Sequence, residues 1–305
     1  MQAVLNVMGW RQINLVVMII LGLVLVPHSV CSEEVRAIQV TPDQEKRSCI
    51  QEVDGYAYLS EEMTLSQVRD VAFLNAKRQA VEMAKTYIES SSKVENFVLK
   101  SDIITGSAAG AVTVLEQKDL GVEKNTRYHV WIKAEVEYSL GSNAESSDKG
   151  AAGNPDAPLT VKVWTPKKQY KTGENIEVYI QGNRDFYARI VDITSEGHIV
   201  QLLPNAFRKL NFFKGGKIYK IPDASDQFDL KVSPPYGQDQ IVVYASEVPL
   251  GDVEMEPLGQ GLSLFKGDRA ALASKTRGIS VVGSGQKTTV GAQFYEAGWT
   301  LTTGE

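Results

Sequence analysis

The sequence predicts an α+β protein, in which a small α/β domain with one long helix on an antiparallel sheet precedes a mainly β, sandwich-like domain. Three observations lead to this prediction. Residues 64–88 place apolar side chains at helical spacing, residues 126–140 alternate with a period of two, and residues 159–246 contain short strand-like runs between turn residues. The first period is that of an amphipathic helix, and the others are those of half-buried strands.

Length and charge limit the classes of function. The 305 residues are 43% apolar and 23% charged, which is enough to bury a core in about two domains. The formal net charge is −5, and the chain contains no basic block. Binding of nucleic acid needs a basic stripe, so no nucleic-acid partner is expected.

The first thirty residues have the layout of a secretory signal. Arg11 precedes an apolar run at residues 13–26, and small residues follow it. The run is shorter than the roughly 20 residues that span a bilayer. We therefore expect residues 1–32 to be a signal peptide that is cleaved after Ser32, which places the mature protein in the periplasm or cell envelope.

Two alternatives to cleavage remain. Cys31 follows the apolar run as a lipoprotein cysteine would, although Val30 stands where a lipobox has Gly, Ala or Ser. Residues 13–26 can instead stay attached as an inner-membrane anchor. Contact with the membrane is expected only through one of these two routes. Cys49 is expected to be a small buried side chain, and a disulfide with Cys31 stays open if cleavage occurs earlier.

An internal boundary lies at residues 141–158, which are rich in Gly, Ala, Ser, Asn, Asp and Pro. Without large apolar side chains the segment cannot offset its ordering entropy, so we expect a flexible linker. It separates a small α/β domain at 36–140 from a β-rich domain at 159–305.

In the first domain a strand is predicted at residues 48–59 and a helix after it. Thr64 and Gln67 form a capping-box pair at the start of the helix. Strands at 111–119 and 126–140 should form an antiparallel hairpin. The apolar stripe of the helix comprises Leu65, Val68, Val71, Ala72, Ala76, Ala80, Val81, Ala84 and Ile88.

Three motifs of this domain resemble one family. They are GYAYL at 55–59, AKRQAVE at 76–82 and YHVWIKAEVEY at 128–138. Residues 48–140 are thereby similar to the amino-terminal domain of flagellar assembly protein T and to related envelope lipoprotein domains. The resemblance implies an α/β envelope module that contacts other proteins, with no enzymatic activity.

The second domain is predicted to be a β-sandwich or barrel, because short strands alternate with turn residues. The expected strands span residues 159–164, 175–182, 186–193, 198–203, 217–221, 228–232 and 240–246. A short helix is expected at 262–274, followed by strands at 278–282 and 291–302 that can complete a sheet.

Four motifs of this domain keep a fixed order. They are YKTGE at 170–174, FYARIVDITSEGHIVQLLPN at 186–205, GGKIYKIPD at 215–223 and FDLKVSPPYGQDQIVVYAS at 228–246. Together they resemble the bacterial family called domain of unknown function 4384, and KTRGISVVG at 275–283 resembles the tail that often follows. The resemblance implies a β-rich accessory or binding module whose biochemical role is not settled.

Motifs that would indicate catalysis are absent from the sequence. His129 and His198 lie in different predicted domains, and neither has a second plausible metal ligand beside it. We therefore predict no catalytic residue, no metal and no cofactor. Two segments suit binding, the proline-fixed loop 233–239 and the aromatic-rich loop 202–216, although each can also be an ordinary turn or loop. The candidate binding residues are Phe207, Arg208, Phe212, Phe213, Pro234, Pro235 and Tyr236.

The function expected from the sequence is that of an exported envelope protein that acts as a non-catalytic interaction or assembly module. Its partners would be envelope proteins that the sequence does not identify. One alternative is a sensor or binding protein for small molecules or glycans. Another is a hydrolase that uses carboxylates, which for glycoside chemistry must converge at roughly 5 to 9.5 Å in one cleft.

Overall fold

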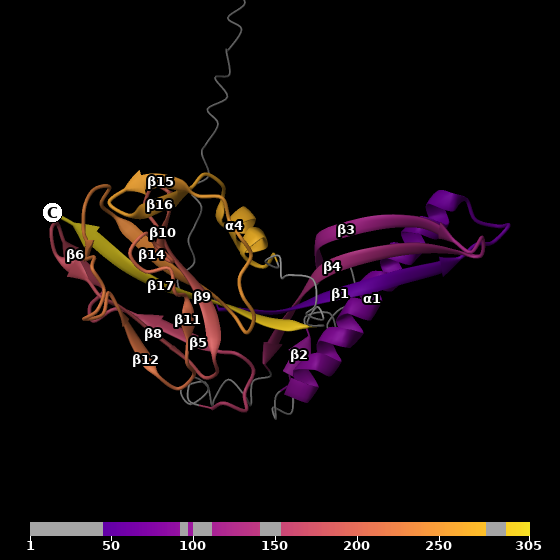
Figure 1. Ribbon diagram of the computed structural model, residues 1–305, viewed down its shortest axis with the longest axis horizontal. Coiled ribbons are helices and arrows are strands. Elements are labelled where there is room, and N and C mark those ends of the chain that lie inside the picture. Colours follow the sequence, from indigo (N-terminus) through magenta and orange to yellow (C-terminus); the bar gives the residue numbers. More distant parts are fainter. Residues whose placement is uncertain (1–44, 92–96, 100–111, 141–153, 279–290) are drawn as a thin grey trace, which may run out of the picture. The chain divides into compact units, whose positions relative to one another are not determined.

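The computed structural model describes residues 45–91, 97–99, 112–140, 154–278 and 291–305 (Figure 1). It confirms the α+β class, with one long helix on an antiparallel sheet followed by a mostly β region. Several sequence-based predictions lie outside these residues: the signal peptide and its cleavage site, the anchor at 13–26, Cys31, the linker up to residue 153, and the strand at 278–282 beyond its first residue. The predicted domain boundaries stay predictions.

The elements follow one another in this order. The first are β1 (Lys46–Tyr58), α1 (Leu65–Ser91), β2 (Phe97–Leu99), β3 (Val112–Glu123) and β4 (Arg127–Leu140). Next come β5 (Val161–Trp164), β6 (Gln169–Lys171), β7 (Asn175–Ile176), β8 (Val178–Gly182), β9 (Phe186–Ile193), β10 (Ile199–Leu203), β11 (Phe212–Phe213), β12 (Ile218–Ile221) and β13 (Leu230–Lys231). The last are β14 (Gln238–Ser246), β15 (Glu256–Gly259), β16 (Leu262–Phe265), α4 (Arg269–Thr276) and β17 (Ala292–Gly304).

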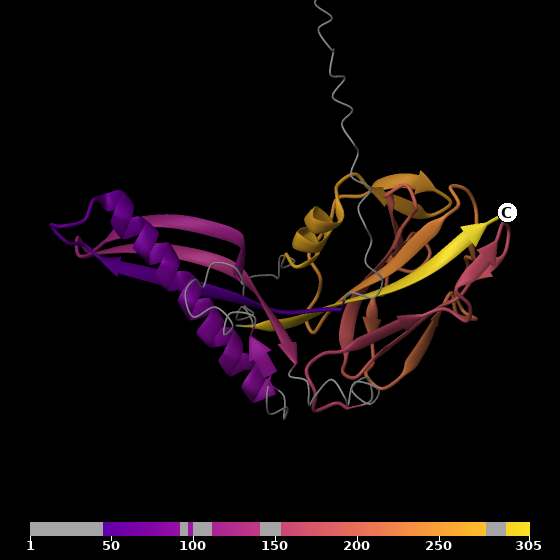
Figure 2. The ribbon, with the colours of Figure 1, turned by 180° about the vertical axis from the view of Figure 1, so that it is seen from behind.

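Helix α1 begins with the predicted capping box. The Thr64 backbone N–H donates to Gln67 Oε1 at 2.8 Å, and the Gln67 N–H donates to Thr64 Oγ1 at 3.3 Å. The helix packs on β1, β3 and β4, and Figure 2 shows it crossing these strands. Its buried face comprises Val68, Ala72, Ala76, Ala80, Ala84 and Ile88. Of the predicted stripe, Leu65 alone among the described side chains is exposed, at 55%.

The buried face of α1 consists largely of alanines, which lets the helix approach the sheet closely. At Gly55 of β1, a Cβ atom would lie 2.3 Å from the Ala72 carbonyl oxygen and 2.6 Å from the Ala76 Cβ. Both distances are far below van der Waals contact. Gly55 is therefore required where the helix crosses β1, for close packing rather than for an unusual backbone angle.

Strand β17 is central to the largest sheet. The strand order is β15-β16-β10-β9-β14-β17-β1-β4-β2, so β17 lies between β14 and β1 (Figures 1 and 2). Its amino-terminal half pairs with β1, matching Lys46 with Glu296. On its other edge it pairs with β14 over nearly its whole length. One sheet thus runs through both domains predicted from the sequence.

The main core of the second half lies between this sheet and two smaller ones. The smaller sheets have the orders β12-β8-β5 and β13-β7. Inward-facing side chains of β9, β14 and β17 meet those of β5 and β8 there, as period-two alternation requires. The largest side chains in this core that are fully buried are Tyr295, Phe186, Phe213, Leu159, Ile180, Ile190, Leu203 and Ile221.

Helix α4 covers the opposite face of the sheet and corrects one prediction. Residues 262–274 were predicted to be one helix, but β16 occupies Leu262–Phe265 and pairs with β10 and β15. The helix begins only after Asp268, whose carboxylate accepts from the Ala271 N–H at 2.7 Å. A run of four residues is too short for periodicity to separate strand from helix.

Buried ion pairs attach the carboxyl end of α4 to the sheet. Arg277 Nε lies 2.7 Å from Glu135 Oε1 of β4, and Arg277 Nη2 lies 3.2 Å from Glu296 Oε2 of β17. All three side chains are no more than 7% exposed. Charges removed from water to this degree need partners, so these contacts fix α4 against β4 and β17.

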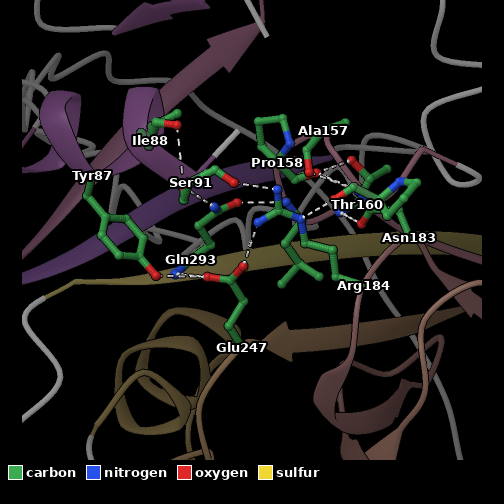
Figure 3. A network of polar contacts seen from close by, with 12 residues as sticks. Tyr87, Ile88, Ser91, Ala157, Pro158, Thr160, Asn183, Arg184, Glu247 and Gln293 are labelled. Carbon is green, nitrogen blue, oxygen red and sulfur yellow. Dashed lines mark hydrogen bonds and ion pairs between the residues drawn. The ribbon is translucent and has the colours of Figure 1, made fainter. Parts of the chain in front are cut away.

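A second polar network surrounds the end of α1 (Figure 3). Arg184 pairs with Glu247 at 3.1 Å and donates to the Ser91 carbonyl oxygen, while Tyr87 donates to the other Glu247 oxygen at 3.1 Å. Gln293 of β17 donates to Ser91 Oγ at 2.9 Å. The network therefore connects the last turn of α1 to β17 and to the loop before β9.

The final residues of the predicted linker belong to the same network. Asn183 Nδ2 donates to the carbonyl oxygens of Ala157 and Pro158 at 3.0 and 3.1 Å, and Ala157 is 5% exposed. Ala157 and Pro158 are therefore packed against the start of the β-rich part, whereas residues 154–156 are exposed.

Gly55→Ala should test the close approach of α1 to β1. The added methyl group has to displace helix backbone, so we expect the free energy of unfolding to fall by about 2 to 3 kcal/mol. Chemical denaturation measures it. The matched control is Gly304→Ala, where an added Cβ meets nothing within 4 Å. Equal stability of the two variants would contradict the packing argument.

Candidate functional site

A cavity of about 430 Å³ lies between the large sheet and the two-stranded sheet β7–β13. One wall consists of side chains from β10, β9, β14, β16 and β17, and the other of residues 229–235 with Ile176 of β7. Its apolar lining residues are Ile176, Val200, Leu202, Leu230, Val232, Ile241, Leu258, Leu262, Leu264 and Leu301. Such a size and lining are typical of small-molecule sites.

Each of two neighbouring strands, β9 and β14, places one carboxyl group in the apolar lining of the cavity. Along β9 the inward positions are Phe186, Ala188, Ile190 and then Asp192, and along β14 they are Ala245, Val243, Ile241 and then Asp239. Both aspartates line the cavity. The inward row of each strand therefore ends in an acidic residue where the alternation would otherwise place an apolar one.

Asp239 is held by the protein on both of its oxygens. Its Oδ1 accepts from the Ser195 backbone N–H at 2.9 Å, and its Oδ2 accepts from Thr303 Oγ1 at 3.0 Å. Burial raises its pKa, whereas these two hydrogen bonds lower it. Asp239 is thus a fixed carboxylate at the wall of the cavity.

Asp192 is in the opposite situation. Its Oδ1 is shielded from solvent and has no hydrogen-bond partner within the described part of the chain. The cross-strand neighbours of Asp192 are Ile241 on β14 and Val200 on β10, both apolar. Burial first, and the charge of Asp239 second, raise the pKa of Asp192 to about 7. Asp192 therefore changes its charge near neutral pH.

The proline-rich loop that was predicted to bind lies at this cavity. Pro234 and Pro235 line its edge. Tyr236 does not project as an aromatic tip, because its hydroxyl donates to Thr172 Oγ1 at 2.7 Å and its ring packs on the core. Its carbonyl oxygen accepts from Ser195 Oγ at 3.1 Å.

The aromatic residues of the other predicted loop do not line the cavity. Phe213 is 1% exposed and stacks on Phe186, while Phe212 contacts Tyr187. Phe207 is 54% exposed and stacks on Phe228. Arg208 forms ion pairs with Asp226 at 3.0 Å and with Asp223 at 3.5 Å. These contacts shape the loop itself.

Of the two histidines singled out earlier, His198 lines the cavity and also lies 3.6 Å from Glu196 at the exposed turn before β10. His129 contacts Asp54 at 2.7 Å and stacks on Tyr56. Cys49 is fully buried, and burial raises the pKa of its thiol to about 12. Within the described residues, no three His, Cys, Asp or Glu side chains gather as metal ligands, and no helix is long and apolar enough to cross a membrane.

Sequence reasoning missed the aspartate pair, although a signal for it exists. Asp192 and Asp239 interrupt apolar alternation at the ends of two strands. The strands were predicted, but their pairing was not, and only the pairing places the two carboxylates in one cavity.

The pKa of Asp192 has a consequence for stability. As pH rises from about 4 to 7, the unfolded state ionises this carboxyl and the folded state does not. The stability of the wild type relative to Asp192→Asn should therefore fall by up to about 1.4 kcal/mol per pH unit in this window and then level off.

Urea denaturation at each pH measures this difference. Glu196→Gln is the control, because the Glu196 side chain is 60% exposed and its removal should give no such slope. Parallel pH profiles for the wild type and Asp192→Asn would contradict burial of the carboxyl.

Comparison with known proteins covers only part of the chain. No curated protein matches it. One family does match, over a segment that contains Asp192, Asp239 and the loop 233–239, and that includes all four motifs at 170–246. The expected tail at 275–283 lies beyond the match. Residues 169–249 match the family described as Domain of unknown function (DUF4384).

Proposed function

We propose that this chain is an exported protein of the bacterial cell envelope that binds a small ligand and catalyses no reaction. The observation that supports it is the cavity of about 430 Å³, which has an apolar lining and a shielded carboxylate oxygen without a partner within the described residues. Apolar pockets with few polar groups are the usual form of ligand sites, in which the polar groups orient the ligand. This favours the ligand-binding alternative over pure assembly.

Nile red, an uncharged dye that fluoresces in apolar surroundings, tests the cavity. We expect saturable binding to the wild type and its loss in Leu264→Trp, because the indole would fill space that Leu264 now borders. Ser263→Trp is the matched control, since its side chain points to the opposite face of β16. Equal dye binding by both variants would place the dye elsewhere and contradict the proposal.

A role in assembly is a further part of the proposal for residues 48–140. Their resemblance to the amino-terminal domain of flagellar assembly protein T and to envelope lipoprotein domains supports contact with envelope proteins. In the β-rich part, Phe207, Leu210 and Leu258 are exposed by 54%, 70% and 52%, which suits a protein partner. Partner contact would then add to ligand binding.

Export rests on the amino-terminal sequence. We expect the protein in the periplasmic fraction with its amino terminus at residue 33, because the apolar run at 13–26 suits a cleaved signal. Cell fractionation and amino-terminal sequencing of the purified protein measure both. A terminus at Met1 in the membrane fraction would support the anchor instead. Unprocessed protein in the cytoplasm would contradict export.

A hydrolase is the second candidate, and the aspartate pair is the observation that favours it. A carboxyl that titrates near pH 7 beside a second, fixed carboxyl group resembles the pair of acids that a hydrolase uses. Release of reducing ends from purified envelope glycans, lost in Asp192→Asn, would replace the binding proposal by this one.

A further inference from the structure

Asp192 Oδ1 has no hydrogen-bond partner within the described residues, and given the proposed function this indicates what kind of ligand the cavity suits. A buried polar atom without a hydrogen bond is unfavourable, and a buried carboxylate more so. Neither Ile241 nor Val200, its neighbours on the adjoining strands, can donate a hydrogen bond from the side chain. Asp192 also lines the cavity, so a partner for its carboxyl group can come from a ligand there.

The titratable groups that face the cavity come from β9, β14, the segment around β13 and the turn before β10. Asp192 belongs to β9, Asp239 to β14, Asp229 and Lys231 to the segment around β13, and His198 to the turn before β10. Asp229, Lys231 and His198 are exposed, whereas Asp239 is buried and Asp192 is partly buried. The shielded charge inside the cavity is therefore negative, and the positive charge of Lys231 stands in solvent at its rim.

We propose that the cavity binds an organic cation, in which an amine or guanidinium nitrogen lies against the carboxyl group of Asp192 and an apolar body contacts the leucines and isoleucines of the walls. Such a nitrogen supplies a charge-assisted hydrogen bond to this carboxyl group. The walls include Ile176, Leu230 and Leu264, which fit an apolar body and not an extended polar ligand.

A divalent metal ion fits the same wall less well. Calcium takes six to eight oxygen ligands and magnesium six. Both oxygens of Asp239 already accept hydrogen bonds from Ser195 and Thr303, which leaves Asp192 and the exposed Asp229 as the other carboxyl groups that line the cavity. A cation with one charged nitrogen needs fewer ligands, and Asp192 with Asp239 nearby can supply them.

Binding of a cation should depend on pH through Asp192. The cation favours the ionised carboxylate, so it lowers the pKa of a group that otherwise titrates at about 7. Below that pH, binding has to release a proton, and affinity falls by up to tenfold per pH unit. Above it, affinity is constant.

Calorimetric titration with three probes of similar size tests the proposal: phenethylamine, phenethyl alcohol and hydrocinnamate. At about pH 8 the amine should bind at least about tenfold more tightly than the alcohol, and hydrocinnamate least. At about pH 6 the advantage of the amine should shrink by about tenfold, with release of a proton that shows in buffers of different ionisation enthalpy.

Two variants assign the preference to one residue. Asp192→Asn should bind the amine and the alcohol equally, because the amide has no charge to offer. Glu196→Gln removes a charge outside the cavity wall and should keep the preference. Amine and alcohol of equal affinity in the wild type, or a preference that persists in Asp192→Asn, would overturn the inference.

The outcome also separates this inference from the proposed function. If Nile red and phenethyl alcohol bind but the amine has no advantage, the cavity is a ligand site for another class of ligand and the cation inference alone fails. If the dye and all three probes fail to bind, both proposals fail together.

Discussion

The main-chain hydrogen bonds on both edges of β17 are the constraint on which the rest of the structure depends. On one edge β17 pairs with β1, which brings α1, β3 and β4 with it. On the other edge it pairs with β14, which continues into β9 and β10. The side chains of β17 also take part in three of the polar features described above. Gln293 belongs to the network at the end of α1, Glu296 to the ion pairs with α4, and Thr303 holds Asp239.

The cavity owes its chemistry to the same sheet. A fully apolar end to the inward rows of β9 and β14 would have closed the sandwich as an ordinary core. Aspartates at these positions place polar carboxyl groups in an apolar cavity, which lowers stability unless the carboxyl oxygens have hydrogen-bond or ionic partners. Asp239 has such partners in Ser195 and Thr303, and Asp192 has none for its Oδ1 within the described residues. Departures from local consistency of this kind tend to mark functional sites.

Local patterns in the sequence were sufficient for much of the fold. The Thr64–Gln67 pair and the alanine stripe located α1, and alternation located β4 and β9 to within a residue or two. Such local patterns did not predict which distant segments contact one another. Period-two alternation in 291–302 predicted a strand, but it contains no information about which strands lie on either side.

The candidate site shows the same division. Pro234 and Pro235 were predicted to form a rigid loop for binding, and they border the cavity. The aromatic-rich segment was a weaker guide, because Phe213 fills the core and Phe212 packs on Tyr187. The helix predicted from residue 262 onward was wrong at 262–265, because these residues pair with β10 and form a strand instead. The sequence alone did not show that the two aspartates lie near each other. This follows from the strand register, which places Asp192 opposite Ile241, two residues from Asp239.

The position of β17 in the sequence also governs how the protein can be made. Lys46 pairs with Glu296, so the edges of β1 and β14 wait unpaired until residues 292–304 have left the ribosome. Contacts between such distant segments form slowly, and unpaired strand edges attract other chains in the meantime. Assembly of the large sheet is therefore expected to be slow, and until it is complete the free edges of β1 and β14 are sites at which other chains can pair.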